Sequence, residues 1–235
     1  VNFRLTPPEL AFLVTDCEAR VLITETALVP VVVAVRELTG LLDAVVVAGA
    51  PSDSAAGLIG YEDLINETGE PHAPVDIPND SPALIMYTSG TTGHPKGVMW
   101  PQDTLIRMLE DVNAEVPAPD DTPEAWVARL AKPGPTVLPA APLMHGTALW
   151  YALPVMSRGG CVVTLPHRRL DVRALLDAIV EESIKGICIV GEAFARPILD
   201  AVAAEPERWD LSGLRVIFSS GAMMRTETKE ALLSL

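Results

Sequence analysis

The chain has 235 residues, of which 49% are hydrophobic, so it is long and apolar enough to build a real core and is not a disordered protein. It carries 17 Lys and Arg against 31 Asp and Glu, and the net charge of −14 excludes general binding to nucleic acid or to an anionic membrane. The longest apolar stretches, residues 27–35 and 41–50, are shorter than the roughly 20 residues that span a bilayer, so no transmembrane segment is predicted.

The first 82 residues predict helices that alternate with continuous apolar strands. Thr6 and Pro7 are typical of a helix start, and an apolar segment at 27–38 ends at Gly40. Strands are expected at 21–24 and 44–49, and residues 51–82 predict a surface connection with a short helix near 61–66. This alternation favours a parallel sheet buried on both faces.

The remaining sequence continues the same rhythm. A strand at 83–89 leads into a glycine-rich loop, and a helix is expected at 101–112, followed by a proline-rich excursion with a short helix around Trp126. The later strands are predicted at 136–143, 161–165, 186–190 and 214–220, and the later helices at 146–156, 171–182, 192–204 and 226–235. Pro154 is expected to interrupt its helix, and Asp171 is a natural N-cap. The predicted architecture is α/β, with mostly parallel sheets flanked by helices.

The three cysteines, Cys17, Cys161 and Cys188, have no CxxC spacing. Cys161 and Cys188 lie in strands that are predicted to be buried, so the favoured interpretation is reduced thiols in the core of a cytoplasmic protein rather than catalytic or metal-binding groups. The chain begins at a valine and ends within a predicted helix, which indicates a fragment or a truncated product.

The stretch YTSGTTGHPKGV, residues 87–98, indicates a polyphosphate-binding loop. Its glycines permit close backbone approach, its hydroxyl residues are donors, and Lys96 supplies a mobile positive charge. A flexible linker is the alternative, but a linker needs no lysine and rarely follows a buried strand. The Walker pattern fails because no glycine directly precedes Lys96, and the dinucleotide pattern GxGxxG fails as well.

Together these segments resemble the adenylate-forming superfamily, which includes acyl-CoA synthetases, firefly luciferase and peptide-synthetase adenylation domains. The glycine loop is similar to the phosphate-loop signature of that superfamily, and PLMHGTALW, VGEAFARPILDA and LRVIFSSGAMM are similar to its later segments. The resemblance is nearest to actinobacterial fatty-acid and steroid-side-chain CoA ligases. It implies an ATP-dependent, AMP-forming acid-thiol ligase that works with ATP, Mg²⁺ and coenzyme A on a small carboxylic acid.

The resemblance also implies roles for individual residues. Those that would hold the β- and γ-phosphates are Thr88, Ser89, Gly90, Thr91, Thr92, Gly93 and Lys96. His145 would lie beside the substrate carboxylate; from its neighbours alone, a helix cap or a buried hydrogen bond is the alternative. The segment between adenine and the acyl pocket would be Ser220, Gly221, Ala222 and Met223. Glu192 departs from the expected Asp, and His94 is expected to be solvated.

The resemblance covers an incomplete N-terminal adenylation domain, expected as an early βα segment at about 1–82 and a phosphate-loop and acyl-pocket subdomain at 83–235. The family's Mg²⁺-binding Glu, its ribose-binding Asp and its C-terminal lid with a catalytic lysine are expected beyond Leu235. The intact parent is therefore expected to be an acyl-CoA ligase and the chain alone nearly inactive. Two alternatives stay open: a non-catalytic remnant with weak nucleotide or acyl binding, and an acyl-AMP ligase that loads a carrier protein.

Overall fold

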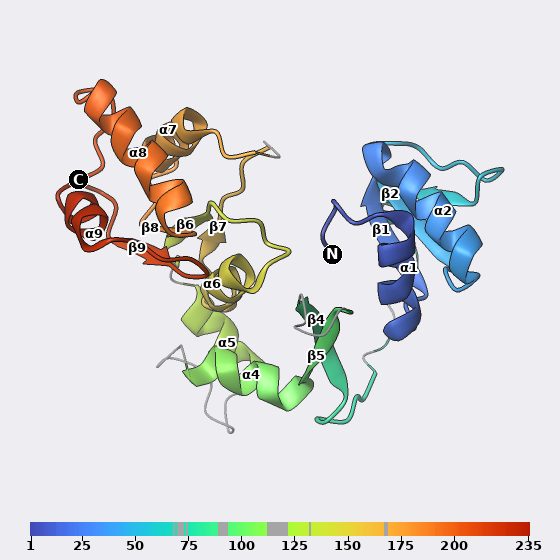
Figure 1. The fold of residues 1–235 in the computed structure, drawn as a ribbon. Coiled ribbons are helices and arrows are strands. Elements are labelled where there is room, and N and C mark those ends of the chain that lie inside the picture. Colours follow the sequence, from blue (N-terminus) through green and yellow to red (C-terminus); the bar gives the residue numbers. More distant parts are fainter. Residues whose placement is uncertain are drawn as a thin grey trace. The chain divides into compact units, whose positions relative to one another are not determined.

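The computed structural model describes residues 1–67, 69, 73, 75–88, 94–111, 122–131, 133–166 and 169–235, and Figure 1 draws it as a ribbon. The chain divides into two compact units, Val1–Asp103 and Thr104–Leu235. Each unit combines helices with strands, and most strand pairs are parallel. The predicted α/β class with mostly parallel sheets is confirmed.

The first unit is built on a three-stranded parallel sheet in the order β1-β2-β3. Its elements are α1 (Pro7–Asp16), β1 (Val21–Glu25), the 3₁₀ turn η1 (Thr26–Leu28), α2 (Val29–Thr39), β2 (Ala44–Ala48), β3 (Leu58–Gly60), α3 (Tyr61–Asn66), β4 (Pro82–Thr88) and β5 (Lys96–Pro101). At the start of α1, the Glu9 carboxylate accepts the Thr6 N–H at 2.8 Å, which satisfies a donor that the helix cannot. Gly40 ends α2 in the left-handed region, at φ 65°.

The core of this unit lies between the sheet and the helices α1 and α2. Val45 and Val47 of β2 and Val35 of α2 belong to one buried cluster, and these three side chains are fully buried. Leu10 and Val14 of α1 join the same cluster. Burial of each such side chain contributes about 1.5–3 kcal/mol, so this cluster fixes α1 against the sheet.

The strands β4 and β5 form a separate antiparallel pair, which the sequence did not predict. A single strand was expected before the glycine loop, with a helix from residue 101. In the structure, residues 96–101 pair with β4 before α4 begins. Gly97 accounts for the missed signal: it weakens strand propensity, yet a Cβ there would lie 2.9 Å from Ile85 on the facing strand, so the close approach requires glycine.

The second unit contains a four-stranded parallel sheet in the order β7-β6-β8-β9. Its elements, with α4 across the boundary, are α4 (Gln102–Asp111), α5 (Pro123–Leu130), β6 (Thr136–Pro139), α6 (Gly146–Ser157), β7 (Cys161–Val162), α7 (Val172–Glu181), β8 (Gly186–Ile189), α8 (Glu192–Ala204), β9 (Val216–Ser219) and α9 (Thr226–Leu233). Its core joins Leu138 of β6 and Ile187 of β8 to Leu176 of α7 and Ile198 of α8, each at most 1% exposed. The Asp171 side chain accepts the Ala174 N–H at 3.0 Å, so the predicted N-cap of α7 is confirmed.

Two expectations in this unit were wrong. Cys161 is exposed, because β7 is only two residues long and, among the described strands, pairs with β6 alone at the edge of the sheet. Cys188, in the central strand β8, is fully buried as expected. Pro154 does not interrupt α6, which continues to Ser157. Proline lacks a backbone N–H and so removes one hydrogen bond to the preceding turn, but the helix continues through it. Across the described residues, every helix is too short or too polar to cross a bilayer.

Candidate functional site

The two ends of the glycine-rich loop face each other across the β4–β5 hairpin. Thr88 ends β4, Lys96 begins β5, and the two residues are paired in the strand register. The Thr88 hydroxyl donates to the Lys96 carbonyl at 3.5 Å, and both residues are exposed. The predicted site residues Ser89, Gly90, Thr91, Thr92 and Gly93 lie outside the described residues. The described part of this site is therefore a hairpin end that presents a lysine to solvent.

Helix α1 contacts strand β4 and the residue His94, which lies two positions before β5. The hydroxyl of Tyr87, on β4, donates to the carboxylate of Asp16, the last residue of α1, at 2.5 Å. His94, shortly before β5, stacks on Phe12 of α1 with ring centroids 4.9 Å apart. Burial, followed by the hydrogen bond to Asp16, raises the pKa of Tyr87, so its hydroxyl stays protonated and remains a donor. His94 is exposed as expected, but this stacking contact was not predicted.

His145 occupies the N-cap position of α6, after strand β6 has ended. Its backbone N–H donates to the Pro142 carbonyl at 3.0 Å, and its carbonyl accepts the first helical hydrogen bond from Leu149 at 3.1 Å. The imidazole makes no capping hydrogen bond and is exposed. The side chain is therefore neither a cap nor buried, and it is open to a ligand.

The segment Ser220–Met223 follows β9 and lies against the end of β8 and the start of α6. A Cβ on Gly221 would lie 3.5 Å from the Thr147 hydroxyl oxygen and 3.6 Å from a Val190 methyl carbon. Gly221 has φ 83°, a left-handed conformation that favours glycine. Met223 is 89% exposed, which is unusual for so large an apolar side chain. Gly221 itself lies beside Thr147 of α6 and Val190, the residue after β8.

The parallel sheet explains why these residues meet. The strands β6, β8 and β9 run in one direction, so their carboxyl ends lie at one edge, where α/β sheets bind ligands. His145 follows β6, and Ser220 follows β9 at that edge. The structure thus brings His145 and Ser220–Met223 into one neighbourhood of the second unit, whereas Thr88 and Lys96 belong to the first unit.

Sequence reasoning missed the residues that hold Ser220–Met223 in place. The Gly191 N–H donates to the Ser219 hydroxyl oxygen at 3.1 Å, and the Glu192 N–H donates to the Met223 carbonyl at 3.2 Å. Gly191 has φ 53° and ψ −151°, and a Cβ there would lie 2.5 Å from the Met223 carbonyl oxygen. The available signals were the glycine that directly follows a predicted strand and the departure of Glu192 from the expected Asp, and neither indicated these contacts.

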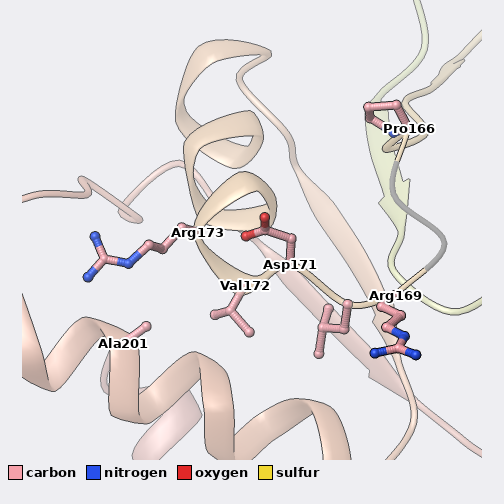
Figure 2. A pocket seen from close by; sticks show the side chains of 7 residues that line it. Pro166, Arg169, Asp171, Val172, Arg173 and Ala201 are labelled. Carbon is pink, nitrogen blue, oxygen red and sulfur yellow. The ribbon is translucent and has the colours of Figure 1, made fainter.

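An open pocket lies elsewhere in the second unit, at the start of α7 (Figure 2). Its lining residues are Pro166, Arg169, Leu170, Asp171, Val172, Arg173 and Ala201. It includes none of the predicted site residues. Asp171 already caps α7, and Arg173 forms an ion pair with Glu205, so two of its charged side chains serve the fold.

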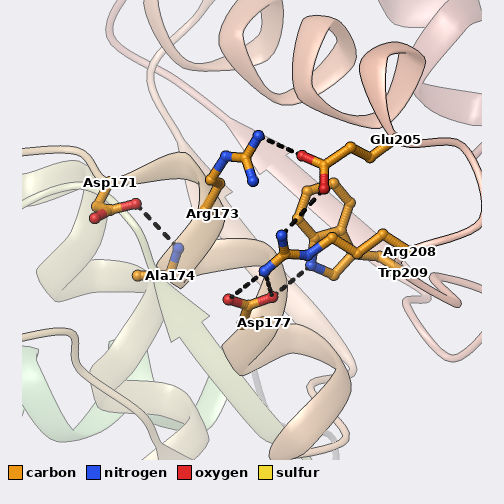
Figure 3. A network of polar contacts seen from close by, with 7 residues as sticks. All are labelled: Asp171, Arg173, Ala174, Asp177, Glu205, Arg208 and Trp209. Carbon is orange, nitrogen blue, oxygen red and sulfur yellow. Dashed lines mark hydrogen bonds and ion pairs between the residues drawn. The ribbon is translucent and has the colours of Figure 1, made fainter.

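A network of charged side chains joins α7 to the segment after α8 (Figure 3). The Trp209 indole N–H donates to Asp177 at 2.7 Å, and Arg208 bridges Asp177 at 3.2 Å and Glu205 at 3.1 Å. The indole bond is the main cause that lowers the pKa of Asp177, followed by Arg208. Trp209 is only 7% exposed, so this network anchors a core residue and is structural. Within the described part of the chain, His, Cys, Asp and Glu side chains form no group of three that could hold a metal ion.

The chain is similar in sequence to a known family and to several characterised ligases. A family described as "AMP-binding enzyme" matches residues 1–235. The chain is 32% identical over its whole length to the medium-chain acyl-CoA ligase Mig of Mycobacterium avium, and 31% identical to the 3-oxocholest-4-en-26-oate–CoA ligase of Rhodococcus rhodochrous. In both cases the chain spans 43% of the length of the relative.

Solved structures share the fold of the chain. An anthranilate CoA ligase in complex with anthranoyl-AMP matches all of this chain and 42% of its own, with a TM-score of 0.79 and 21% identity. The N-terminal domain of FACL13 from Mycobacterium tuberculosis matches all of this chain and 52% of its own, with a TM-score of 0.71 and 22% identity. At these identities the matches establish the architecture alone.

Proposed function

Because the chain belongs to the AMP-binding enzyme family, we propose that it is part of an acyl-CoA ligase that activates a fatty acid or a steroid-side-chain acid. The observation that carries this proposal is the match of the whole chain, at 31–32% identity, to two relatives named as CoA ligases for such acids. A cytoplasmic location and the use of ATP and coenzyme A belong to the same proposal.

The reaction would proceed in two balanced steps. A carboxylate oxygen attacks the α-phosphorus of ATP, and the bond to pyrophosphate breaks to give acyl-AMP. The sulfur of coenzyme A then attacks the acyl carbonyl, the thiol proton is released, and AMP leaves with the electrons of the broken bond. The substrate carboxylate is itself the nucleophile, so the protein contributes positioning and charge neutralisation.

The residues of this chain fit those two tasks. Lys96 and Thr88 would contact the β- and γ-phosphates, together with the predicted loop residues Ser89–Gly93. His145, exposed at the start of α6, would contact the substrate carboxylate, and Ser220–Met223 would lie between adenine and the acyl group. Mg²⁺ would screen the phosphate charges when ATP is bound, and no residue of this chain is assigned to hold it.

Turnover by these 235 residues alone should be very slow, because they span 43% of the length of either CoA-ligase relative. Pyrophosphate release and CoA consumption would be measured on the purified chain with a panel of fatty and steroid acids. Robust turnover would refute the slow-turnover expectation and support the ligase proposal. Acyl-AMP formation without CoA consumption would instead support an enzyme that loads a carrier protein.

Binding of inorganic pyrophosphate and of ATP, measured by calorimetry, tests the phosphate site without turnover. Lys96→Ala should weaken binding about 10- to 100-fold, since a charge-assisted hydrogen bond contributes about 1.5–3 kcal/mol. Lys229→Ala, at an exposed position on α9, is the matched control and should bind as the unchanged chain does. Equal binding by the two lysine variants would contradict the role of Lys96, and no binding by any form would favour a non-catalytic remnant.

A further inference from the structure

Helix α9 begins at Thr226, three residues after Met223. Its N-cap residue is Arg225, whose side chain makes no capping hydrogen bond. In the usual capping box, a Glu three residues into the helix accepts the N–H of the N-cap residue. That position in α9 is Thr228, whose side chain is too short to reach back. The Arg225 N–H is therefore left to water or to an acceptor from elsewhere in the chain.

Glu192, the first residue of α8, supplies that acceptor. One oxygen of its carboxylate accepts the Arg225 N–H at 2.8 Å. Thr228, which is 3% exposed, also favours the charged form of this carboxylate. A carboxylate beside the start of a helix is further favoured by the helix dipole.

The backbone of Glu192 also contacts the segment Ser220–Met223. Its N–H donates to the Met223 carbonyl at 3.2 Å, two residues before the Arg225 N–H that its side chain accepts. Upstream, the Ser220 N–H donates to the Ile189 carbonyl at 3.4 Å. Residues 220–225 are thus tied at both ends to the segment 189–192, and Glu192 makes two of these ties.

We propose that Glu192 is a positioning residue, which fixes the conformation of Ser220–Met223 by capping α9 from the neighbouring helix. Its meaning for catalysis rests on the proposed function, which places nucleotide and acyl group against Ser220–Met223. The lowered pKa of Glu192, caused first by the Arg225 N–H and then by Thr228, agrees with a carboxylate that stays charged and accepts the Arg225 N–H.

Three variants separate this role from general stability. Glu192→Ala removes the acceptor, Glu192→Gln keeps one carbonyl oxygen, and Glu230→Ala removes an equal charge from an exposed position on α9. Amide hydrogen exchange would be measured for Arg225 and, as a measure of global opening, for the buried strand β8. In Glu192→Ala the Arg225 amide should exchange at least about tenfold faster, by more than any change in β8. Glu192→Gln should restore much of the protection, and Glu230→Ala should leave it unchanged.

Binding of AMP by the same four proteins links the positioning to the proposed site. If the unchanged chain binds AMP, Glu192→Ala should weaken that binding, with partial recovery in Glu192→Gln. Unchanged Arg225 exchange in Glu192→Ala, or faster exchange there matched by equally faster exchange in β8, would overturn the positioning role. Unchanged AMP affinity in Glu192→Ala would overturn its link to the nucleotide. Absence of AMP binding by the unchanged chain would count against the proposed function, while the exchange data would still decide the role of Glu192.

Discussion

Replacement of Gly191 by alanine should destabilise the second unit severely, for two separable reasons. The first is conformational: φ 53° with ψ −151° lies in a region that side-chain-bearing residues rarely occupy, at a cost of about 1–3 kcal/mol. The second is steric: the new methyl group would lie 2.5 Å from the Met223 carbonyl oxygen and 2.9 Å from the Ala222 Cβ. Overpacking of this kind costs about 1–3 kcal/mol, so the total should be about 2–6 kcal/mol.

Two further glycines allow the two causes to be separated. Gly221 shares a positive φ, 83°, but its Cβ would meet only ordinary contacts at 3.5 Å or more, so Gly221→Ala should cost about 1–2 kcal/mol. Gly213 has neither feature: its φ is not positive, and the nearest atom to its Cβ would be the Lys185 Nζ at 3.6 Å. Gly213→Ala should therefore change stability by less than about 1 kcal/mol.

The free energy of unfolding of the second unit can be measured from amide exchange in the fully buried strand β8, residues Gly186–Ile189. The expected order of destabilisation is Gly191→Ala first, Gly221→Ala second and Gly213→Ala last. If Gly191→Ala and Gly221→Ala agree within about 0.5 kcal/mol, the close approach of the Met223 carbonyl contributes nothing and the steric part of the reasoning is wrong.

Two more predictions concern single side chains. Tyr87→Phe removes the hydroxyl that donates to Asp16 at 2.5 Å and should lower the unfolding free energy of the first unit by about 1 kcal/mol. Amide exchange in β2 would measure this free energy. An unchanged value would mean that the hydrogen bond has no net effect on stability. Burial raises the pKa of Cys188 to about 11, so this thiol is protonated at pH 8 and should resist alkylation by iodoacetamide. The exposed Cys161 should react readily under the same conditions. Mass spectrometry of the alkylated peptides would show the order of reaction, and faster labelling of Cys188 would contradict its burial.

Sequence patterns predicted the regular elements of this chain better than its irregular ones. The helices α7 and α8 and the strand β8 were predicted nearly to their observed ends, because a long apolar period and the Asp171 cap act locally. The strand β5 was missed because its pairing partner, not its own composition, makes it a strand. The exposure of Cys161 was missed for a related reason, since a residue's burial depends on whether its strand is central or at an edge.

The candidate site was predictable only in part, for the same physical reason. Lys96 and His145 stood out because their side chains carry chemistry within short motifs. Glu192 stood out only as a departure from an expected Asp, and its partners, Arg225 and Thr228, are more than thirty residues away in the sequence. Such tertiary hydrogen bonds leave no local pattern. The site roles of Thr88, Lys96, His145 and Ser220–Met223 stay predictions, as do those of the loop residues Ser89–Gly93.

The contacts of α1 with the β4–β5 hairpin have a consequence for the order of folding. The hairpin can close quickly, because its strands are adjacent in the chain, whereas the bond from Tyr87 to Asp16 spans 71 residues. Helix α1 is synthesised before the β4–β5 hairpin. Its core partners in α2 and β2 also precede the hairpin in the chain, so these contacts can form first. We therefore expect α1, α2 and β2 to fold first. The strands β4 and β5, which flank the glycine loop, should then dock onto α1 as a hairpin that forms later.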